Sequence, residues 1–91
     1  MAHFEREEVT GALLDVQRVP SHKFVVARLD LERDKVLDLK HHIQMNPATA
    51  DARRLSRTWP EHRVVMMMDI HVAQQLTRHV VWDSRHWKRK N

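Results

Sequence analysis

The sequence contains no cysteine and only one glycine, Gly11. Without cysteine there can be no disulfide scaffold, no thiolate zinc site and no cysteine nucleophile. One glycine is too few for a glycine-rich phosphate loop or a dinucleotide-binding fingerprint. The longest uninterrupted apolar run, Val64 to Met68, is far too short to span a membrane. The first residues are charged and lack the apolar core of a secretion signal, so we expect a cytoplasmic protein.

The residues that are present have the balance of a globular domain, with 42% hydrophobic and 31% charged residues in a chain of 91. A chain of this length forms one domain. We therefore predict a single domain over residues 1–91 with a basic carboxy-terminal tail from about residue 84 to residue 91.

The net charge of +4 lies entirely in residues 76–91, which hold five basic residues and one acidic residue. The other 75 residues carry eleven charges of each sign. Two of the three tryptophans, Trp82 and Trp87, also lie in this segment. A basic, aromatic tail on a neutral body favours an anionic partner, with nucleic acid first.

Three prolines divide the chain, and the apolar spacing between them predicts local structure. Residues 5–18 and 34–45 have apolar positions at helical spacing. Residues 23–32 alternate between apolar and polar, as in a strand with one buried face. Asn46 is a good cap and Pro47 a good first residue for a further helix over residues 47–58.

The remaining segments are a short apolar run and an ambiguous stretch after it. Val64 to Met68 is typical of a strand covered on both faces. Residues 70–83 fit a helix capped by Asp69. Alternatively the strand continues to Val72, and Leu76 to Trp82 returns as a second strand. Because no Gly, Asn, Asp or Ser lies between those two runs, a tight hairpin lacks its usual turn residues, and we favour the helix.

These elements predict an α+β fold, a small single domain with a short two-stranded sheet packed with three to four helices. An isolated pair of strands is marginally stable in water. We therefore expect two chains to complete one sheet, which predicts a homodimer.

The first candidate site is the tail. Its cations would neutralise phosphates, and an exposed indole at Trp87 would stack on an unpaired base. The tail residues assigned to nucleic-acid binding are Arg85, Trp87, Lys88, Arg89 and Lys90. The alternative is a solvated end that keeps the protein soluble.

The second candidate is an arginine cluster on the helix predicted for residues 47–58. Arg53, Arg54 and Arg57 have the i, i+3 and i, i+4 spacings that gather side chains on one face. Such a face can follow a phosphate backbone, although alone it is more often an ordinary solvated surface partly neutralised by Asp51.

Two catalytic or metal-binding alternatives are weaker. If the last helix continued through Trp87, then His79, Asp83 and His86 would share one face with ligand types that suit a divalent metal. The Asp38-Leu39-Lys40 triplet, with Asp30 upstream, superficially matches a restriction-type nuclease. That chemistry needs these residues on adjacent strands, whereas we predict a helix there, so we set it aside.

The sequence therefore predicts a small, basic, non-enzymatic nucleic-acid-binding protein without a cofactor. The alternative is a small regulator or inhibitor that binds a larger, acidic protein through the Arg85–Trp87 region, because tryptophan and arginine dominate protein interfaces. A metal-dependent hydrolase is the third possibility.

Overall fold

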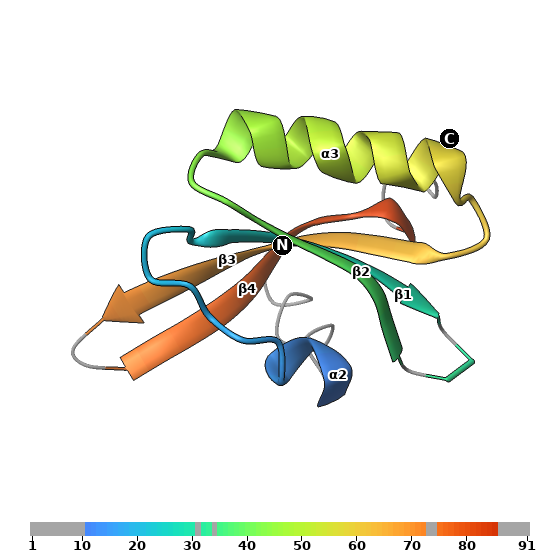
Figure 1. Ribbon diagram of the computed structural model, residues 1–91. Helices are drawn as coiled ribbons and strands as arrows, with labels where there is room; N and C mark the ends of the chain where they lie inside the picture. Colours follow the sequence, from blue (N-terminus) through green and yellow to red (C-terminus); the bar gives the residue numbers. More distant parts are fainter. Residues whose placement is uncertain (1–10, 31, 34, 73–74, 86–91) are drawn as a thin grey trace.

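Four strands form one antiparallel sheet in the order β2-β1-β3-β4, shown in Figure 1 for the computed structural model. The structure describes residues 11–30, 32–33, 35–72 and 75–85. Its elements, in chain order, are α2 (Gly11–Leu14), β1 (Phe24–Asp30), β2 (Lys35–His42), α3 (Met45–Thr58), β3 (Arg63–Val72) and β4 (Gln75–Asp83). Two hairpins, β1–β2 and β3–β4, are joined by α3, which lies across one face of the sheet.

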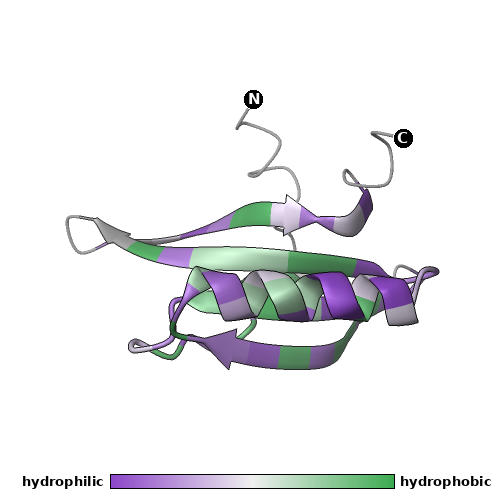
Figure 2. Cartoon of the chain, turned by 90° about the horizontal axis from the view of Figure 1, so that it is seen from above, coloured by the Kyte–Doolittle hydropathy of each residue, from purple (hydrophilic) through white to green (hydrophobic). Residues whose placement is uncertain are grey.

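Helix α3 covers the sheet with a narrow apolar stripe. Ala48, Ala52 and Leu55 recur at helical spacing and pack against β1 and β3, where their partners include Val26 and Met66. Seen from above, the helix runs in nearly the same direction as the strands and carries hydrophilic segments on its outer side (Figure 2). The helix ends where the Trp59 N–H donates to the Leu55 carbonyl at 2.8 Å and Pro60 follows.

The opposite face of the sheet has its own core. Leu13 and Val16, from α2 and the turn after it, pack there against buried residues of three strands. Those strand residues are Val25, Ala27, Leu29, Val65, Met67 and Val80. Strands β1 and β3 are thus covered on both faces, which confirms the prediction of a doubly covered strand at Val64–Met68.

A buried arginine fixes α2 to the sheet. The Arg78 guanidinium donates from Nε to Asp69 Oδ1 at 2.6 Å and from Nη2 to Asp69 Oδ2 at 2.8 Å. Its Nη1 atom donates to the carbonyls of Leu13 and Val16, at 2.6 and 3.0 Å. The side chain of Arg78 is only 1% exposed and has little contact with water. Asp69 therefore compensates its charge, and the carbonyl groups of the α2 segment accept hydrogen bonds from its remaining N–H donors.

The prediction of a two-stranded sheet with three to four helices is wrong. Residues 35–42 form strand β2, because they pair with β1 from Phe24↔His42 to Asp30↔Lys35. Residues 70–72 belong to β3 and residues 75–83 to β4, two paired strands, as in the alternative that we did not favour. Apart from α3, the described residues hold the four-residue α2 and a helical pair at Ser84 and Arg85.

The other sequence predictions fared unevenly. The strand predicted at 23–32 is confirmed as β1, but the expectation of one buried face is wrong, because Val25 to Leu29 are all buried and the strand is covered on both faces. The helix predicted at 47–58 is confirmed as α3, although α3 begins at Met45 with Gln44 rather than Asn46 as its cap. The helix predicted over residues 5–18 contains α2, and residues 5–10 lie outside the described residues.

The sheet also removes the reason for expecting a dimer, since one chain supplies four paired strands. The homodimer stays a prediction. Among the described residues no helix is long and apolar enough to cross a membrane.

Candidate functional site

The outward face of α3 carries the three arginines singled out from the sequence. Arg53, Arg54 and Arg57 are all exposed, on the side of the helix away from the buried Ala48, Ala52 and Leu55. Arg54 donates from Nη2 to Asp51 Oδ1 at 2.6 Å, while its side chain stays 60% exposed. Within the described part of the chain, Arg57 makes no hydrogen bond or ion pair. The structure thus brings these three cations onto one surface.

A polar cleft separates α3 from the edge strand β2. Alternation along β2 turns Asp38, Lys40 and His42 toward α3, since they pair with Arg28, Val26 and Phe24 of β1. The cleft has a volume of about 300 Å³. Its lining residues are Val26, Asp38, Leu39, Lys40, Asp51, Arg54, Leu55 and Trp59, and we call it the α3–β2 cleft.

A buried carboxylate at Asp51 organises the floor of this cleft. It accepts hydrogen bonds from Arg54 Nη2 at 2.6 Å and from His42 Nε2 at 3.1 Å. Burial alone would raise the pKa of the Asp51 carboxyl, but these hydrogen bonds and the positive charges of Arg54 and Lys40 bring the pKa below its ordinary value. Asp51 is therefore a fixed anion that holds Arg54 at the rim of the cleft.

Trp59 lies at the end of α3 and is held by its neighbours. Its carbonyl accepts from the His62 N–H at 3.1 Å, which closes a four-residue turn with Pro60 in its second position. The Arg28 guanidinium lies 4.2 Å from the centre of the Trp59 ring, and the His62 ring stacks on Trp59 at 5.7 Å between centroids. Even so, Trp59 is 37% exposed.

Sequence reasoning missed Trp59 as a functional residue. It placed the indole in the apolar stripe of the helix, four residues after Leu55. The signal that could have identified it is Pro60, which ends the helix immediately after Trp59 and so places the indole beyond the last buried turn.

Of the predicted tail, Ser84 and Arg85 lie among the described residues. Ser84 anchors the end of β4 through a 3.0 Å hydrogen bond from the Val64 N–H to its Oγ atom, and Arg85 lies 3.8 Å from Asp83. Strand β4 ends beside the start of β3, and Figure 1 shows the carboxy-terminal end of α3 at this same end of the sheet. Arg85 follows β4, and Trp59 follows α3. Trp87, Lys88, Arg89 and Lys90 lie outside the described residues.

The structure does not gather the weak metal candidates. The predicted helix that would have aligned them is a strand, in which His79 pairs with Met68 and Asp83 with Val65, on opposite faces of the sheet. Asp83 is held by Arg63 at 2.8 Å, and His86 lies outside the described residues. Among the residues that the structure describes, no group of three His, Asp or Glu side chains could hold a metal.

The nuclease-like triplet does lie on a strand, contrary to the reason for setting it aside. Asp38 and Lys40 share a face of β2, with Asp51 across the cleft. Both carboxylates are held by arginine at 2.6 Å, Asp38 by Arg28 and Asp51 by Arg54, and Asp30 lies 3.7 Å from the Arg33 Nε atom. The carboxylates are thus neutralised by neighbouring cations, which disfavours metal-dependent hydrolysis at this cleft.

The sequence matches no protein-family model, and comparison with curated proteins and with solved structures likewise gave no significant match.

Proposed function

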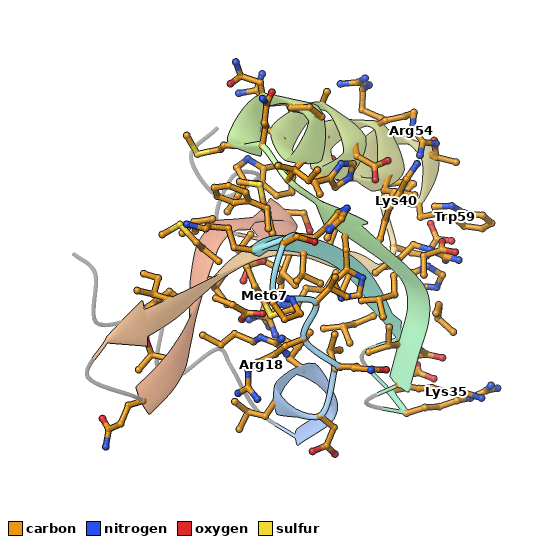
Figure 3. All side chains as sticks on the ribbon, turned by 60° about the vertical axis from the view of Figure 1, so that its left-hand side comes forward. Arg18, Lys35, Lys40, Arg54, Trp59 and Met67 are labelled. Carbon is orange, nitrogen blue, oxygen red and sulfur yellow. The ribbon has the colours of Figure 1, made fainter. Side chains whose placement is uncertain are left out.

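We propose that this protein binds nucleic acid and does not act as an enzyme, with cations of α3 and of the α3–β2 cleft as phosphate contacts. The observation that carries the proposal is the grouping of Lys40, Arg54 and Trp59, which come from two elements and lie on one side of the molecule (Figure 3). Cations beside an exposed indole are the usual composition of a nucleic-acid surface.

Two of these cations are exposed to solvent and open to a ligand. Lys40 and Arg57 are exposed, and neither forms a hydrogen bond or ion pair with a residue that the structure describes. When such side chains neutralise phosphates, the nucleic acid releases its bound counterions, so the affinity decreases steeply as the salt concentration rises. Arg54 is paired with Asp51 through its Nη2 atom, but its side chain is 60% exposed, so the guanidinium can still contact a phosphate.

The tail belongs to the same proposal. Arg85 is the last described residue of the chain, and the basic residues that follow it in the sequence are proposed as further phosphate contacts. Trp87, Lys88, Arg89 and Lys90 are included on sequence grounds alone.

The test is a fluorescence-anisotropy titration of labelled oligonucleotides, single-stranded and duplex, at 50 and 200 mM salt, the interval over which phosphate contacts lose most affinity. We expect saturable binding that weakens with salt. Lys40→Ala combined with Arg57→Ala should flatten the salt slope by about 1.5–2 units. The matched control is Arg18→Ala with Lys23→Ala, which removes the same charge around a separate hollow of about 380 Å³ at the other end of β3. No saturable binding at 50 mM salt would overturn the proposal.

The contribution of the tail is tested in the same assay. Replacing Lys88, Arg89 and Lys90 by alanine should weaken binding to all sequences and flatten the slope by about 2–3 units. An unchanged slope would remove the tail from the site.

A protein-binding role is the second candidate, favoured by one separate observation. Ile43, in the β2–α3 connection, and Met45, the first residue of α3, are 60% and 52% exposed, and an apolar anchor of this kind is common at protein interfaces. Binding to a larger protein would survive about 0.5 M salt if its anchor is apolar, whereas phosphate contacts would not.

A further inference from the structure

We infer that Trp59 is a stacking platform for one unpaired base, so that the protein prefers single-stranded nucleic acid to duplex. This inference rests on the proposed function, because it names the class of nucleic acid that the same site takes. It is carried by the arrangement of the groups around the indole.

The contacts of Arg28 and His62 with the indole and with each other place both groups on the same side of the Trp59 ring. Arg28 lies 4.2 Å from the ring centre, and the His62 ring stacks on the indole at an angle of 25°. The Arg28 Nη1 and His62 Nδ1 atoms are also hydrogen-bonded to each other at 2.7 Å. Groups on opposite faces of an aromatic ring would be separated by about two contact distances, roughly 7 Å, so a hydrogen bond between them would be impossible. Both groups therefore cover one face of the indole.

The indole also borders the α3–β2 cleft. Trp59 lines this cleft together with Lys40 and Arg54, whereas neither Arg28 nor His62 lines it. The exposed 37% of Trp59 is then the surface that a flat ligand meets. The cleft volume of about 300 Å³ lies at the lower end of the range for small-molecule sites, which suits one nucleotide.

Cations beside the stacking surface supply the second part of nucleotide recognition. Lys40 comes from β2 and Arg54 from α3, so the two flank the cleft from opposite walls (Figure 3). A base lying on Trp59 would place its phosphates within reach of such flanking cations. A base inside a duplex already has both faces stacked, whereas an unpaired base offers a face to an aromatic side chain.

The indole is also held in place before any ligand arrives. The backbone of Trp59 is fixed by two hydrogen bonds: its N–H donates to the Leu55 carbonyl at 2.8 Å, and its carbonyl accepts from the His62 N–H at 3.1 Å. Arg28, which covers its inner face, is fixed by Asp38 at 2.6 Å. A ring that is already oriented loses little conformational freedom on binding, which favours affinity.

The first experiment compares Trp59→Leu with Trp59→Phe in the anisotropy assay. Loss of one stacked base should weaken binding to a single-stranded oligonucleotide by roughly 5- to 150-fold in Trp59→Leu. Phenylalanine keeps a stacking face and should restore most of the affinity. Duplex binding, which depends on phosphate contacts, should change little. Phe24→Leu is the matched control, because Phe24 is an aromatic residue that packs against the same helix-facing core without lining the cleft.

A second measurement does not depend on the stability of the Trp59→Leu protein. In a chain with Trp82→Phe and Trp87→Phe, Trp59 is the only indole, and a stacked base should quench its emission with the same midpoint as the anisotropy titration. Unchanged emission at saturation, or equal affinity for single strand and duplex, would overturn this inference and leave phosphate binding intact. Absence of binding to either strand form would instead overturn the proposed function.

Discussion

Arg78 connects three parts of the chain, since its guanidinium bonds Asp69 of β3 and two carbonyls of the α2 segment. The ion pair is buried, with 1% exposure of the arginine side chain and 7% of the aspartate. Removing one partner of such a pair leaves an uncompensated charge in a medium of low dielectric constant.

Arg78→Ala should therefore destabilise the fold by about 3–5 kcal/mol, measured as the free energy of unfolding in urea. The control, Arg54→Ala, removes an arginine from an ion pair in which it is 60% exposed, and should cost less than about 1 kcal/mol. Similar losses of unfolding free energy in the two variants would contradict a special contribution of the buried Arg78–Asp69 ion pair.

Asp51 gives the stability a dependence on pH. The pKa of the Asp51 carboxyl is lower in the folded protein than in the unfolded chain, where it is about 3.9. The stability that this carboxylate contributes is therefore complete above the pKa of the unfolded chain, and it is lost as the pH falls through the lower pKa of the folded protein. The difference in unfolding free energy between wild type and Asp51→Asn should be largest near pH 7 and shrink below about pH 4. The exposed Asp15→Asn is the control, and a difference that does not vary with pH would refute this assignment.

At the scale of elements, the start of α3 is incompletely capped. Gln44 has the extended conformation of a cap residue but makes no side-chain hydrogen bond. Because Pro47 has no N–H, only the N–H of Asn46 is available to a capping side chain at this end.

In Gln44→Ser, the hydroxyl oxygen should accept a hydrogen bond from the Asn46 N–H. This should stabilise the protein by about 0.5–1 kcal/mol, measured from the shift of the thermal midpoint. The same change at the exposed Gln17, which is not at a helix end, should have little effect. A loss of stability in Gln44→Ser would show that the glutamine side chain does more than the structure indicates.

Elements with strong local signals were predictable, and those fixed by distant partners were not. The alternation in β1 and the apolar stripe of α3 are visible in the sequence. Val36, Leu39 and Ile43 have helical spacing, yet pairing with β1 makes residues 35–42 the strand β2, in which Leu37 and Leu39 stay partly exposed. The β3–β4 hairpin joins through residues 73 and 74, an Ala-Gln pair without turn-forming residues, so its register had no local signal.

The same limit applied to the candidate site. The arginines of α3 could be placed on one face from their spacing alone. The cleft could not, because it needs β2 as a strand and Trp59 beyond the last buried turn. Its ion pairs join residues such as Arg28 and Asp38 that meet only through the sheet.

For the whole molecule, the two cores share strands β1 and β3. One core contains Leu13 and the other Leu55, on opposite faces of the same sheet. Neither can be exposed without disturbing strands that the other needs, so we expect one cooperative transition.

Leu13→Ala and Leu55→Ala should each lower the unfolding free energy by about 2–5 kcal/mol. Far-ultraviolet circular dichroism and tryptophan fluorescence should give coincident unfolding curves in both variants. Two separated transitions would show that the cores melt independently.

The position of Arg78 also sets an order of events in time. Leu13, to which it bonds, precedes it by 65 residues, so the segment of the chain made early during synthesis waits for one of the last strands before it can dock. The α2 segment should therefore join after the rate-limiting barrier. In stopped-flow measurements, Leu13→Ala should accelerate unfolding while leaving the refolding rate nearly unchanged. A nascent chain would thus keep one face of its sheet uncovered until β4 is complete, and that face is where a chaperone would bind during synthesis.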